Sequence, residues 1–472
     1  MQAAMNNRVR NVYDRMPALA QNIVLTGYSA ILDRERYGAG FRHFQGWLDK
    51  TQWYSLEELR SYQEEQLARL IQYSYRHVPY YRRVMDEHDV KPGDITSTSD
   101  LSRLPLLTRQ DIKDNFADLL SDEFDLARVK KGHTSGTTGS PLEICYSDQV
   151  IQITYALLDR HYRWAGVRMK KKGDRVAVLR GNPIVPLKQN KPPFWRYNFL
   201  HNQLLLSCFH MSPQNLPLYV DKLRHYAPRL LDGYPSTLYV LARYLQSTGQ
   251  KVPLHAVVSS SETLYDFQRE TIEESFQCKV FDYFAAAERV VFSNECEYHE
   301  GHHISDEYGI TEILDDSDYR VEPGKLGVLV ATSLHNYAMP MIRYVTNDMS
   351  SIRMQSCSCG RGLPLMDDVT TKAEDLLTLR DGRIISPSVL THPFKPLTSI
   401  EASQIIQEDL DHVRIKIVPT PAYTDHDGEI LIDGLKERLG NAVDVCIEKV
   451  DVLERTKAGK FKWVISNVKM GI

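Results

Sequence analysis

The residues with the clearest chemical signature form a polar loop, HTSGTTGSPLEI, at positions 133–144. Glycine lets the backbone approach a ligand, and hydroxyl and exposed N–H groups donate hydrogen bonds to anions such as polyphosphates. We therefore predict a phosphate cradle, although a plain surface turn can have the same composition. Ser140 and Pro141 follow the second glycine, where a Walker A loop needs lysine, so the pattern excludes a P-loop NTPase. The predicted cradle residues are Thr134, Ser135, Gly136, Thr137, Thr138 and Gly139.

Cysteine and histidine residues form a second constellation, independent of the loop. Three thiolates and one imidazole suit a tetrahedral Zn²⁺ with Zn–S bonds of about 2.3 Å. Four protein ligands leave no open position for water, so we expect a structural zinc. His299 and His302 compete for the place of the nitrogen ligand, and unliganded buried cysteines are the alternative. The predicted ligands are Cys296, His303, Cys357 and Cys359.

Several further motifs follow one another in a fixed order along the chain. They are RHVPYYRR, the polar loop, KPPFWRYN, LDGYPSTL, VVSSSETL, FDYFAAAE, MPMIRYVTNDM, CSCGR and TKAGKFK. In this order they resemble the adenylate-forming acyl-activating enzymes, most closely the phenylacetate-CoA ligase family and its capsular polysaccharide biosynthesis branch. The resemblance covers nearly the whole chain. It implies a large acyl-activating domain followed by a small mobile domain.

The resemblance implies a role for each motif residue. The polar loop would hold the β and γ phosphates of ATP, Glu288 would help to hold Mg²⁺, and Asp348 would accept hydrogen bonds from the ribose. Lys460 would be the mobile catalytic lysine, with Glu374 near the hinge, and His303 is the best aligned zinc ligand. The other residues implied to bind ATP are Ser260, Ser261, Glu262, Asp282, Tyr283 and Lys372.

The acyl pocket is less sharply defined. Tyr234 and Pro235, in DGYPS, are candidates for its wall. His133 would either polarise a substrate carboxylate or orient the polar loop. The aromatic segment KPPFWRYN lines the pocket or packs under the N-terminal helices, because aromatic side chains serve pockets and cores alike.

These roles agree with elementary chemistry. Attack of a carboxylate on the α-phosphate of ATP brings two anions together and builds charge on the phosphoryl oxygens, which Mg²⁺ and a lysine stabilise. Surface carboxylates in ordinary salt bridges and a solvated lysine on a glycine turn are the alternatives for Glu288, Asp348 and Lys460.

The chain departs from the family pattern at three places. Phe284 and Ala285 stand where the family has Tyr-Gly, and Ala287 stands where it has a hydroxyl residue. Lys372 replaces the usual arginine before the hinge, which exchanges a bidentate donor for a point charge. Either nucleotide binding is adjusted or activity is weakened.

The elements that must position these residues follow from hydrophobic patterning. Residues 56–90 have helical spacing broken at Pro79, and short apolar runs alternate with helical runs afterwards, which predicts an α/β fold with parallel strands. Ligands of such folds lie at the carboxyl ends of the strands. We expect a mainly helical extension (1–110), an adenylate-forming core (111–373) and a small α+β domain (374–472).

Composition narrows the function class. The 472 residues carry 57 basic and 61 acidic side chains, interspersed along the chain, which argues against a nucleic-acid surface. No apolar window has the length of a membrane span. The N-terminal apolar patch is interrupted by Gln21, Asn22 and Tyr28, and suggests a docking helix or, alternatively, weak contact with a membrane surface. Seven cysteines without disulfide spacing favour a reducing cytoplasm.

These features predict an ATP-dependent acid ligase that forms an acyl adenylate from a carboxylic acid and transfers the acyl group to coenzyme A or to an amine. The alternative is a degenerate nucleotide- or acyl-binding scaffold in a polysaccharide pathway. The expected cofactors are ATP, Mg²⁺ and structural Zn²⁺, with coenzyme A as a further candidate. A homodimer is a family-level expectation.

Overall fold

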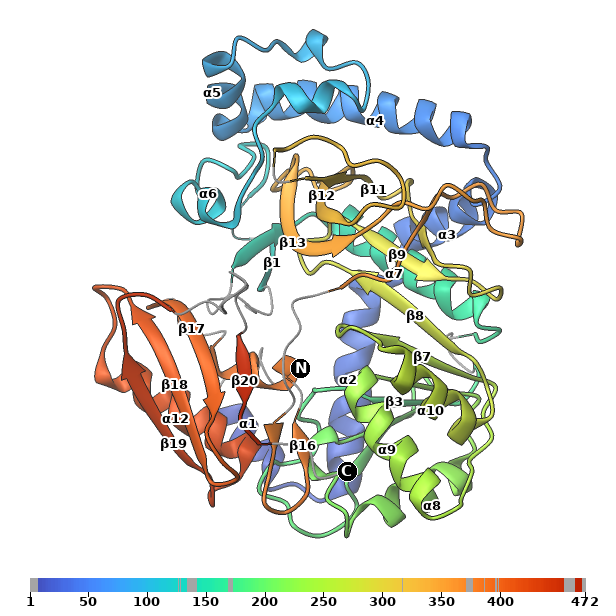
Figure 1. Cartoon of the computed structure of the whole chain (residues 1–472), viewed down its shortest axis with the longest axis vertical. Helices are drawn as coiled ribbons and strands as arrows, with labels where there is room; N and C mark the ends of the chain where they lie inside the picture. The colour runs from blue at the N-terminus through green and yellow to red at the C-terminus, as the bar shows by residue number, and fades with distance from the viewer. Residues whose placement is uncertain are drawn as a thin grey trace.

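The structure is a computed structural model in which N-terminal helices, a large sheet and a small C-terminal unit are arranged as in Figure 1. It describes residues 7–125, 127, 129–133, 142–168, 173–315, 317–370, 377–385, 387–394, 397, 399–453 and 463–468. Among the described helices, none combines the length and apolar character needed to cross a bilayer. The α/β class predicted from the sequence is confirmed.

The N-terminal part is helical, as predicted. Helix α4 begins at a capping box in which Ser55 and Glu58 exchange hydrogen bonds, and it ends before Pro79, where a new helix starts. The helices are α1 (Asn7–Asp14), α2 (Ala18–Arg36), α3 (Ala39–Thr51), α4 (Leu56–His77), α5 (Pro79–Glu87) and α6 (Arg109–Asp114), with 3₁₀ turns at Pro92–Asp94 and Asp100–Arg103.

Helix α2 docks on the protein, as one of the two sequence interpretations predicts, but with an unexpected face. It buries Gln21 and Asn22 beside Leu25, and it exposes Leu19 and Ile23. The physical reason is that the edge strand beside it, β4 (Trp195–Asn198), offers hydrogen-bonding groups to the helix; for example, the backbone N–H of Tyr197 donates to Asn22 Oδ1 at 2.9 Å. The polar face therefore packs inward.

The main sheet runs in the order β14-β10-β9-β8-β7-β6-β3-β5-β4, and its central strands β5, β3, β6, β7 and β8 are parallel. The strands predicted at 176–179, 230–231, 257–258 and 280–284 all lie in this parallel part. Its strands are β3 (Val176–Leu179), β4, β5 (Gln203–Leu206), β6 (Leu230–Gly233), β7 (Ala256–Ser260), β8 (Val280–Ala285), β9 (Phe292–Glu295), β10 (His302–Ile304) and β14 (Leu365–Met366). Its helices are α7 (Asp148–Trp164), α8 (Leu216–Tyr226), α9 (Pro235–Ser247) and α10 (Asp266–Phe276), with a 3₁₀ turn at Cys208–His210.

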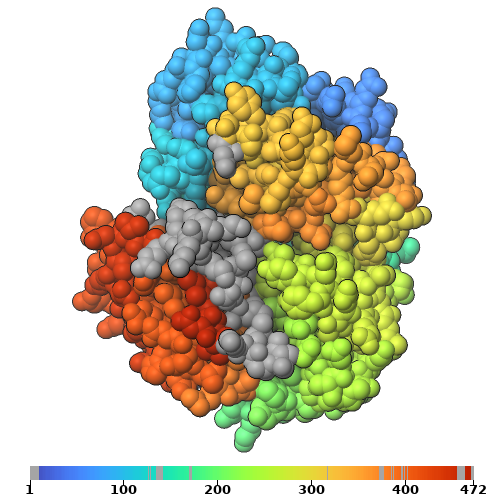
Figure 2. Space-filling view, in the orientation of Figure 1, coloured from blue at the N-terminus to red at the C-terminus, as the bar shows by residue number. Residues whose placement is uncertain are grey.

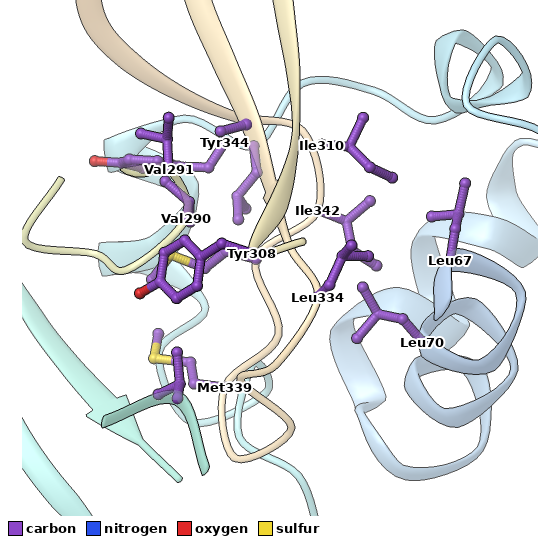
Figure 3. Packing of buried hydrophobic residues seen from close by; sticks show 14 of the residues in the cluster. Leu67, Leu70, Val290, Val291, Tyr308, Ile310, Leu334, Met339, Ile342 and Tyr344 are labelled. Carbon is purple, nitrogen blue, oxygen red and sulfur yellow. The ribbon is translucent and has the colours of Figure 1, made fainter. Parts of the chain in front are cut away.

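A second sheet joins the N-terminal helices to the core. Its antiparallel strands are β11 (Gly309–Leu314), β12 (Gly327–Ser333) and β13 (Tyr344–Ser350). In Figure 3, Leu67 and Leu70 of α4 point toward Leu334 and Ile342, so the apolar face of α4 is buried against this sheet and its connections. Beside it stands the hairpin of β1 (Lys130–His133) and β2 (Glu143–Tyr146).

The C-terminal unit forms its own sheet, in the order β19-β18-β17-β20. It lies beside the large unit in Figure 2, where it is orange and red. Apolar side chains of both units share one hydrophobic cluster, and Arg10 of α1 pairs with Glu437 of α12 at 2.7 Å. Its elements are β15 (Leu377–Thr378), β16 (Ile384–Ile385), α11 (Pro387–Leu390), a 3₁₀ turn at His392–Phe394, β17 (Ile400–Gln407), β18 (His412–Pro419), α12 (Asp425–Leu439), β19 (Asp444–Lys449) and β20 (Val464–Ser466).

Candidate functional site

The carboxyl ends of β3, β6 and β8 bring together a buried ionic cluster. Arg180, directly after β3, donates from Nη2 to Asp232 Oδ1 at 2.6 Å and to the Tyr283 hydroxyl at 3.1 Å. The Tyr162 hydroxyl donates to the second oxygen of Asp232 at 2.8 Å. Burial disfavours the charged guanidinium, but the Asp232 carboxylate keeps the pKa of Arg180 above its usual value. Tyr283, predicted beside the nucleotide, is thereby fixed at the crevice edge.

The adjacent ends of β7 and β8 carry the predicted adenine-side residues. Strand register places Ser260 beside Tyr283, and the Ser259 hydroxyl donates to Asp282 Oδ1 at 2.5 Å. Burial raises the pKa of Asp282 to about 7. Ser261 turns the chain away from the sheet with a φ of 73°. These residues therefore lie at one edge of the sheet, where ligands of such folds bind.

Glu262 and Tyr234 meet at the start of helix α9. The Glu262 carboxylate accepts the backbone N–H of Ser236 at 3.0 Å, in the first turn of the helix, where a negative charge is favourable. Tyr234 precedes Pro235, the first residue of α9, and burial raises the pKa of its phenol to about 12. A Cβ on Gly181 would come within 3.1 Å of the Tyr234 ring, so this close approach requires glycine. Tyr234 thus forms a rigid wall beside Arg180.

Two predicted carboxylates lie near Tyr344. The Tyr344 hydroxyl donates to Glu288 Oε1 at 2.7 Å, and Asp348 follows on the same strand, β13. Burial together with the Glu288 and Asp348 carboxylates raises the pKa of Tyr344 well above its usual value. The Tyr344 hydroxyl therefore orients the Glu288 carboxylate, the predicted Mg²⁺ ligand. Its pKa also responds to the Asp348 carboxylate, which is predicted to bind the ribose.

Hairpin β1–β2 carries the polar loop. His133, the last residue of β1, pairs with Glu143, the first residue of β2. The two ends of the polar loop are therefore close together. The Tyr146 hydroxyl donates to the carbonyl oxygen of Ala287 at 2.7 Å, which ties the base of the hairpin to the residue before Glu288. The predicted residues Thr134, Ser135, Gly136, Thr137, Thr138, Gly139, Lys372, Glu374 and Lys460 lie outside the described residues.

The four predicted zinc ligands converge, although they come from segments about 60 residues apart. Their ligand atoms all lie within 4.8 Å of one another. The sulfur atoms of Cys296 and Cys357 are 3.5 Å apart, as are Cys359 Sγ and His303 Nε2. A tetrahedron with Zn–S bonds of about 2.3 Å has ligand separations of this order. The geometry therefore fits a zinc ion.

The surroundings of this centre also fit a metal. His303 Nδ1 donates to the Leu363 carbonyl at 3.3 Å, which leaves Nε2 to face the cysteines. Burial alone would raise the pKa of Cys359, but its contacts with the His303 ring and with the Arg361 N–H outweigh it and lower that pKa to about 6. One of the thiols is therefore prepared to bind as a thiolate.

The competing histidines belong to another group. Glu295, His302 and Asp368 also bring ligand atoms together within 4.8 Å. Both Glu295 oxygens are already occupied, by Arg269 and by the backbone N–H of Asp282. His302 Nε2 lies 3.3 Å from Asp368 and 3.6 Å from Asp282, as in an ion pair. The protein groups around this second cluster are thus Arg269, the Asp282 backbone and, when His302 is protonated, the Asp282 and Asp368 carboxylates.

Known proteins share this architecture. Residues 377–467 match the family model described as the CapK C-terminal domain. Protein CapK of Staphylococcus aureus is 25% identical over 97% of this chain and 99% of its own length. The phenylacetate-coenzyme A ligase of Thermus thermophilus is 27% identical over 81% of this chain and 86% of its own. The chain is therefore similar, over most of its length, to protein CapK and to phenylacetate-coenzyme A ligases.

Solved structures resemble this CapK-like chain in fold. A 2-hydroxyisobutyryl-CoA ligase, crystallised with 2-HIB-AMP and CoA in the thioesterification state, superposes with a TM-score of 0.57. The match covers 88% of this chain and 91% of that one, at 20% sequence identity. The same ligase in the postadenylation state matches with a TM-score of 0.54. At this level of identity the likeness shows the fold alone.

Sequence analysis missed four residues that position the CapK-like site: Tyr146, Arg180, Asp232 and Tyr344. Two signals were present in the chain. Arg180 follows a fully apolar strand, and Asp232 interrupts an apolar run just before Gly233, which is where α/β folds place ligand-facing polar residues. Tyr146 and Tyr344 carried no such signal, because their roles depend on contacts with residues that are distant in the sequence. Ala287 lies 141 positions from Tyr146, and Glu288 lies 56 positions from Tyr344.

Proposed function

We propose that the chain is an ATP-dependent acid ligase, which forms an acyl adenylate and then transfers the acyl group to coenzyme A. The relatives named phenylacetate-coenzyme A ligase support this reaction. The observation that carries the proposal is the convergence of Glu288, Asp348, Tyr283 and the base of the polar loop at the carboxyl ends of the parallel strands. Those motifs are far apart in the sequence, yet the hydrogen bonds of Tyr146 and Tyr344 link them to the segment that follows β8.

In the first step the acid attacks the α-phosphate of ATP. The polar loop would bind the β and γ phosphates, Asp348 would accept hydrogen bonds from the ribose, and Ser260 with Tyr283 would border the adenine. Mg²⁺, bound when ATP is present, neutralises phosphate charge. Glu288 is suited to hold it, because the Tyr344 hydroxyl fixes one of its oxygens, and the other has no hydrogen bond within the described part of the chain. Lys460 would stabilise the transition state.

Ser260 and Ser261 are the adenine-side residues of this proposal with the least committed side chains. Glu262 is engaged at the start of α9, so its contribution is to hold the loop after β7 in place. Asp282 accepts a hydrogen bond from the Ser259 hydroxyl, which fixes the residue that precedes Tyr283. The adenine-side contacts therefore come from Tyr283 and the serines.

The acid would bind beside Tyr234 and Arg180. Arg180 lies over the faces of Tyr234 and Tyr283, with its charged carbon 5.9 Å and 5.8 Å from the two ring centres. Its guanidinium is only partly used by Asp232 and Tyr283, so donors remain for an acid that carries a hydroxyl, amide or second carboxylate group. We propose that the pocket takes a polar acid.

We propose that the Cys296, His303, Cys357 and Cys359 centre holds a structural zinc. Three sulfur ligands and one nitrogen complete a tetrahedron, so the ion has no open position for chemistry. It would tie the end of β9 and strand β10 to the loop between β13 and β14. That loop follows the strand that carries Asp348.

Acid-dependent exchange of radioactive pyrophosphate into ATP tests the proposed reaction. Purified protein with Mg²⁺ is supplied with aryl acids, fatty acids, hydroxy acids and amino acids in turn. We expect exchange with one class of acid and release of AMP when coenzyme A is added. Release of AMP on addition of an amine instead would make the protein an amide ligase.

A scaffold is the second candidate function, and the changes at Ala285 and Ala287 favour it. The Ala287 backbone still serves the site by accepting the Tyr146 hydroxyl, but its side chain offers no hydroxyl to a phosphate. ATP binding without exchange for any acid in the panel would support the scaffold.

A further inference from the structure

We propose that helix α2 is a docking surface for an anionic lipid bilayer. This inference is independent of the proposed reaction. It concerns where the protein is held, and it rests on the reversed orientation of the helix, on an uninterrupted apolar stripe and on unpaired positive charge at both ends of that stripe.

The polar side of α2 is already used inside the protein. Besides Asn22, Thr26 accepts the backbone N–H of Phe199 at 3.1 Å. Ser29 accepts a hydrogen bond from the Asn198 side chain at 2.9 Å. The helix is therefore fixed to the edge of the main sheet by hydrogen bonds.

The opposite side is apolar and exposed. Leu19, Ile23 and Ile31 are 67%, 63% and 61% exposed, and their spacing of four and eight residues places them on one face. Gly27 lies between them, and a Cβ added there would meet nothing within 4 Å. We call these four residues the α2 stripe. Phe199, beside Thr26, is 58% exposed and extends the same surface.

The size of this apolar surface indicates a binding site. Single exposed apolar side chains are ordinary, but a contiguous patch is usually a binding site. An α-helix of 19 residues is about 28 Å long, so the stripe can lie along a flat surface. Amphipathic helices of this length bind in the interface of a bilayer with their axis parallel to it.

The charges at the two ends of the α2 stripe indicate which kind of flat surface it would bind. Arg15 and Arg34 are exposed at the two ends of the stripe, and within the described part of the chain neither forms an ion pair. The neighbouring acids already have partners: Asp33 Oδ1 lies 2.8 Å from His201 Nε2, and Glu35 pairs with Lys130. The ends of the stripe are therefore positive, and anionic lipid headgroups complement them.

A second copy of the chain fits this surface less well. In an antiparallel pair of α2 helices Arg15 of one copy would approach Arg34 of the other, and in a parallel pair each arginine would meet its own equivalent. Either arrangement brings like charges together at both ends of the contact, which disfavours association. An anionic bilayer complements both the apolar α2 stripe and the positive charges at its ends.

Sedimentation with lipid vesicles tests the proposal. Wild-type protein should bind vesicles of phosphatidylcholine and phosphatidylglycerol in equal parts at low salt. We expect binding at least tenfold weaker to phosphatidylcholine alone, and weaker binding in high salt. Because one short apolar face with two arginines is a weak anchor, binding should be reversible.

Two variants separate the apolar and charged contributions. Replacing Leu19, Ile23 and Ile31 together by serine should weaken binding at least tenfold, and Arg15→Gln with Arg34→Gln should weaken it about tenfold and remove most of the salt dependence. A matched control replaces three exposed apolar residues elsewhere by serine and should bind like wild type. The control residues are Leu326, Met354 and Tyr319.

Thermal melting serves as the readout of folding, since all the altered side chains are exposed and the melting temperature should stay constant. Equal binding to neutral and anionic vesicles, binding unaffected by the triple variant, or no binding at all would overturn the proposal. A dimer in light scattering that the triple variant abolishes, without vesicle binding, would make a second copy the occupant. Failure of the pyrophosphate exchange assay would not change the interpretation of the vesicle-binding measurements.

Discussion

At the scale of single residues, Glu288 depends on Tyr344 for its orientation. Glu288→Gln should lower the rate of acid-dependent exchange by about 10² to 10³, because it removes the carboxylate proposed to hold Mg²⁺. Tyr344→Phe keeps that carboxylate and removes the hydrogen bond at 2.7 Å, so we expect about a tenfold loss and a higher Mg²⁺ requirement. Exchange rates over a range of Mg²⁺ concentrations check both, and full activity of Glu288→Gln would contradict the role.

Arg180 and Asp232 form a mostly buried ion pair, which makes a stability prediction. Arg180→Met leaves the Asp232 carboxylate without its cation, and we expect a loss of about 3 to 5 kcal/mol in the free energy of unfolding. Adding Asp232→Leu to Arg180→Met should recover much of this loss. Urea titration measures both variants. Exposed Arg103→Met is the control and should change stability by less than about 0.5 kcal/mol.

Residue roles differed in how readily the sequence revealed them. Cys296, His303, Cys357 and Cys359 were predicted as one set, and their ligand atoms converge, because few other arrangements satisfy four such residues. Glu288 and Asp348 were predicted from motifs, whereas the phenol between them was not. A hydrogen bond between residues 288 and 344 is a property of the packed sheet, and no local pattern encodes it.

At the scale of elements, the β1–β2 hairpin positions the polar loop through one close approach. A Cβ on Gly132 would lie 2.4 Å from the Tyr146 ring, whose hydroxyl is held by the Ala287 carbonyl. Gly132→Ala should therefore displace the ring, cost about 1 to 3 kcal/mol and raise the KM for ATP. Gly93→Ala is the control, because a Cβ there meets nothing within 4 Å. An unchanged KM for ATP in Gly132→Ala would separate the hairpin from the nucleotide.

The predicted zinc centre joins the end of β9, strand β10 and the loop before β14. Elemental analysis should find about one zinc per chain, and Cys357→Ser should remove it and lower the melting temperature. Cys446→Ser is the matched control, since Cys446 is exposed and far from the centre in sequence. Wild-type protein without metal and with an unchanged melting temperature after chelation would refute the site.

Strands were the elements best predicted from sequence. The apolar runs before Gly181 and Gly233 could be recognised because a buried parallel strand is apolar on both faces and ends in a turn. The face that helix α2 buries was not predicted, because the sequence pattern gives an apolar face but not the direction of that face. Only the polar edge of β4, which comes more than 150 residues later, shows that the helix packs with its polar side inward.

At the scale of the whole molecule, the C-terminal unit shares a hydrophobic cluster with the large unit and contacts it through polar bridges as well. Arg10 pairs with Glu437, and Arg383 donates to the Phe209 carbonyl at 3.1 Å. A single partly exposed ion pair and one hydrogen bond contribute little, so these polar contacts do not forbid a change in the relative position of the units. A two-step reaction in which Lys460 acts only in the first step requires such a change.

The most direct test is a single-turnover experiment with ATP, Mg²⁺ and the acid found by exchange, in the absence of coenzyme A. We predict that wild-type protein accumulates one equivalent of acyl adenylate, which coenzyme A then converts to a thioester with release of AMP. Lys460→Ala should form the adenylate about 10² to 10³ times more slowly, yet still convert supplied adenylate. ATP that binds but yields no adenylate with any acid would contradict the account.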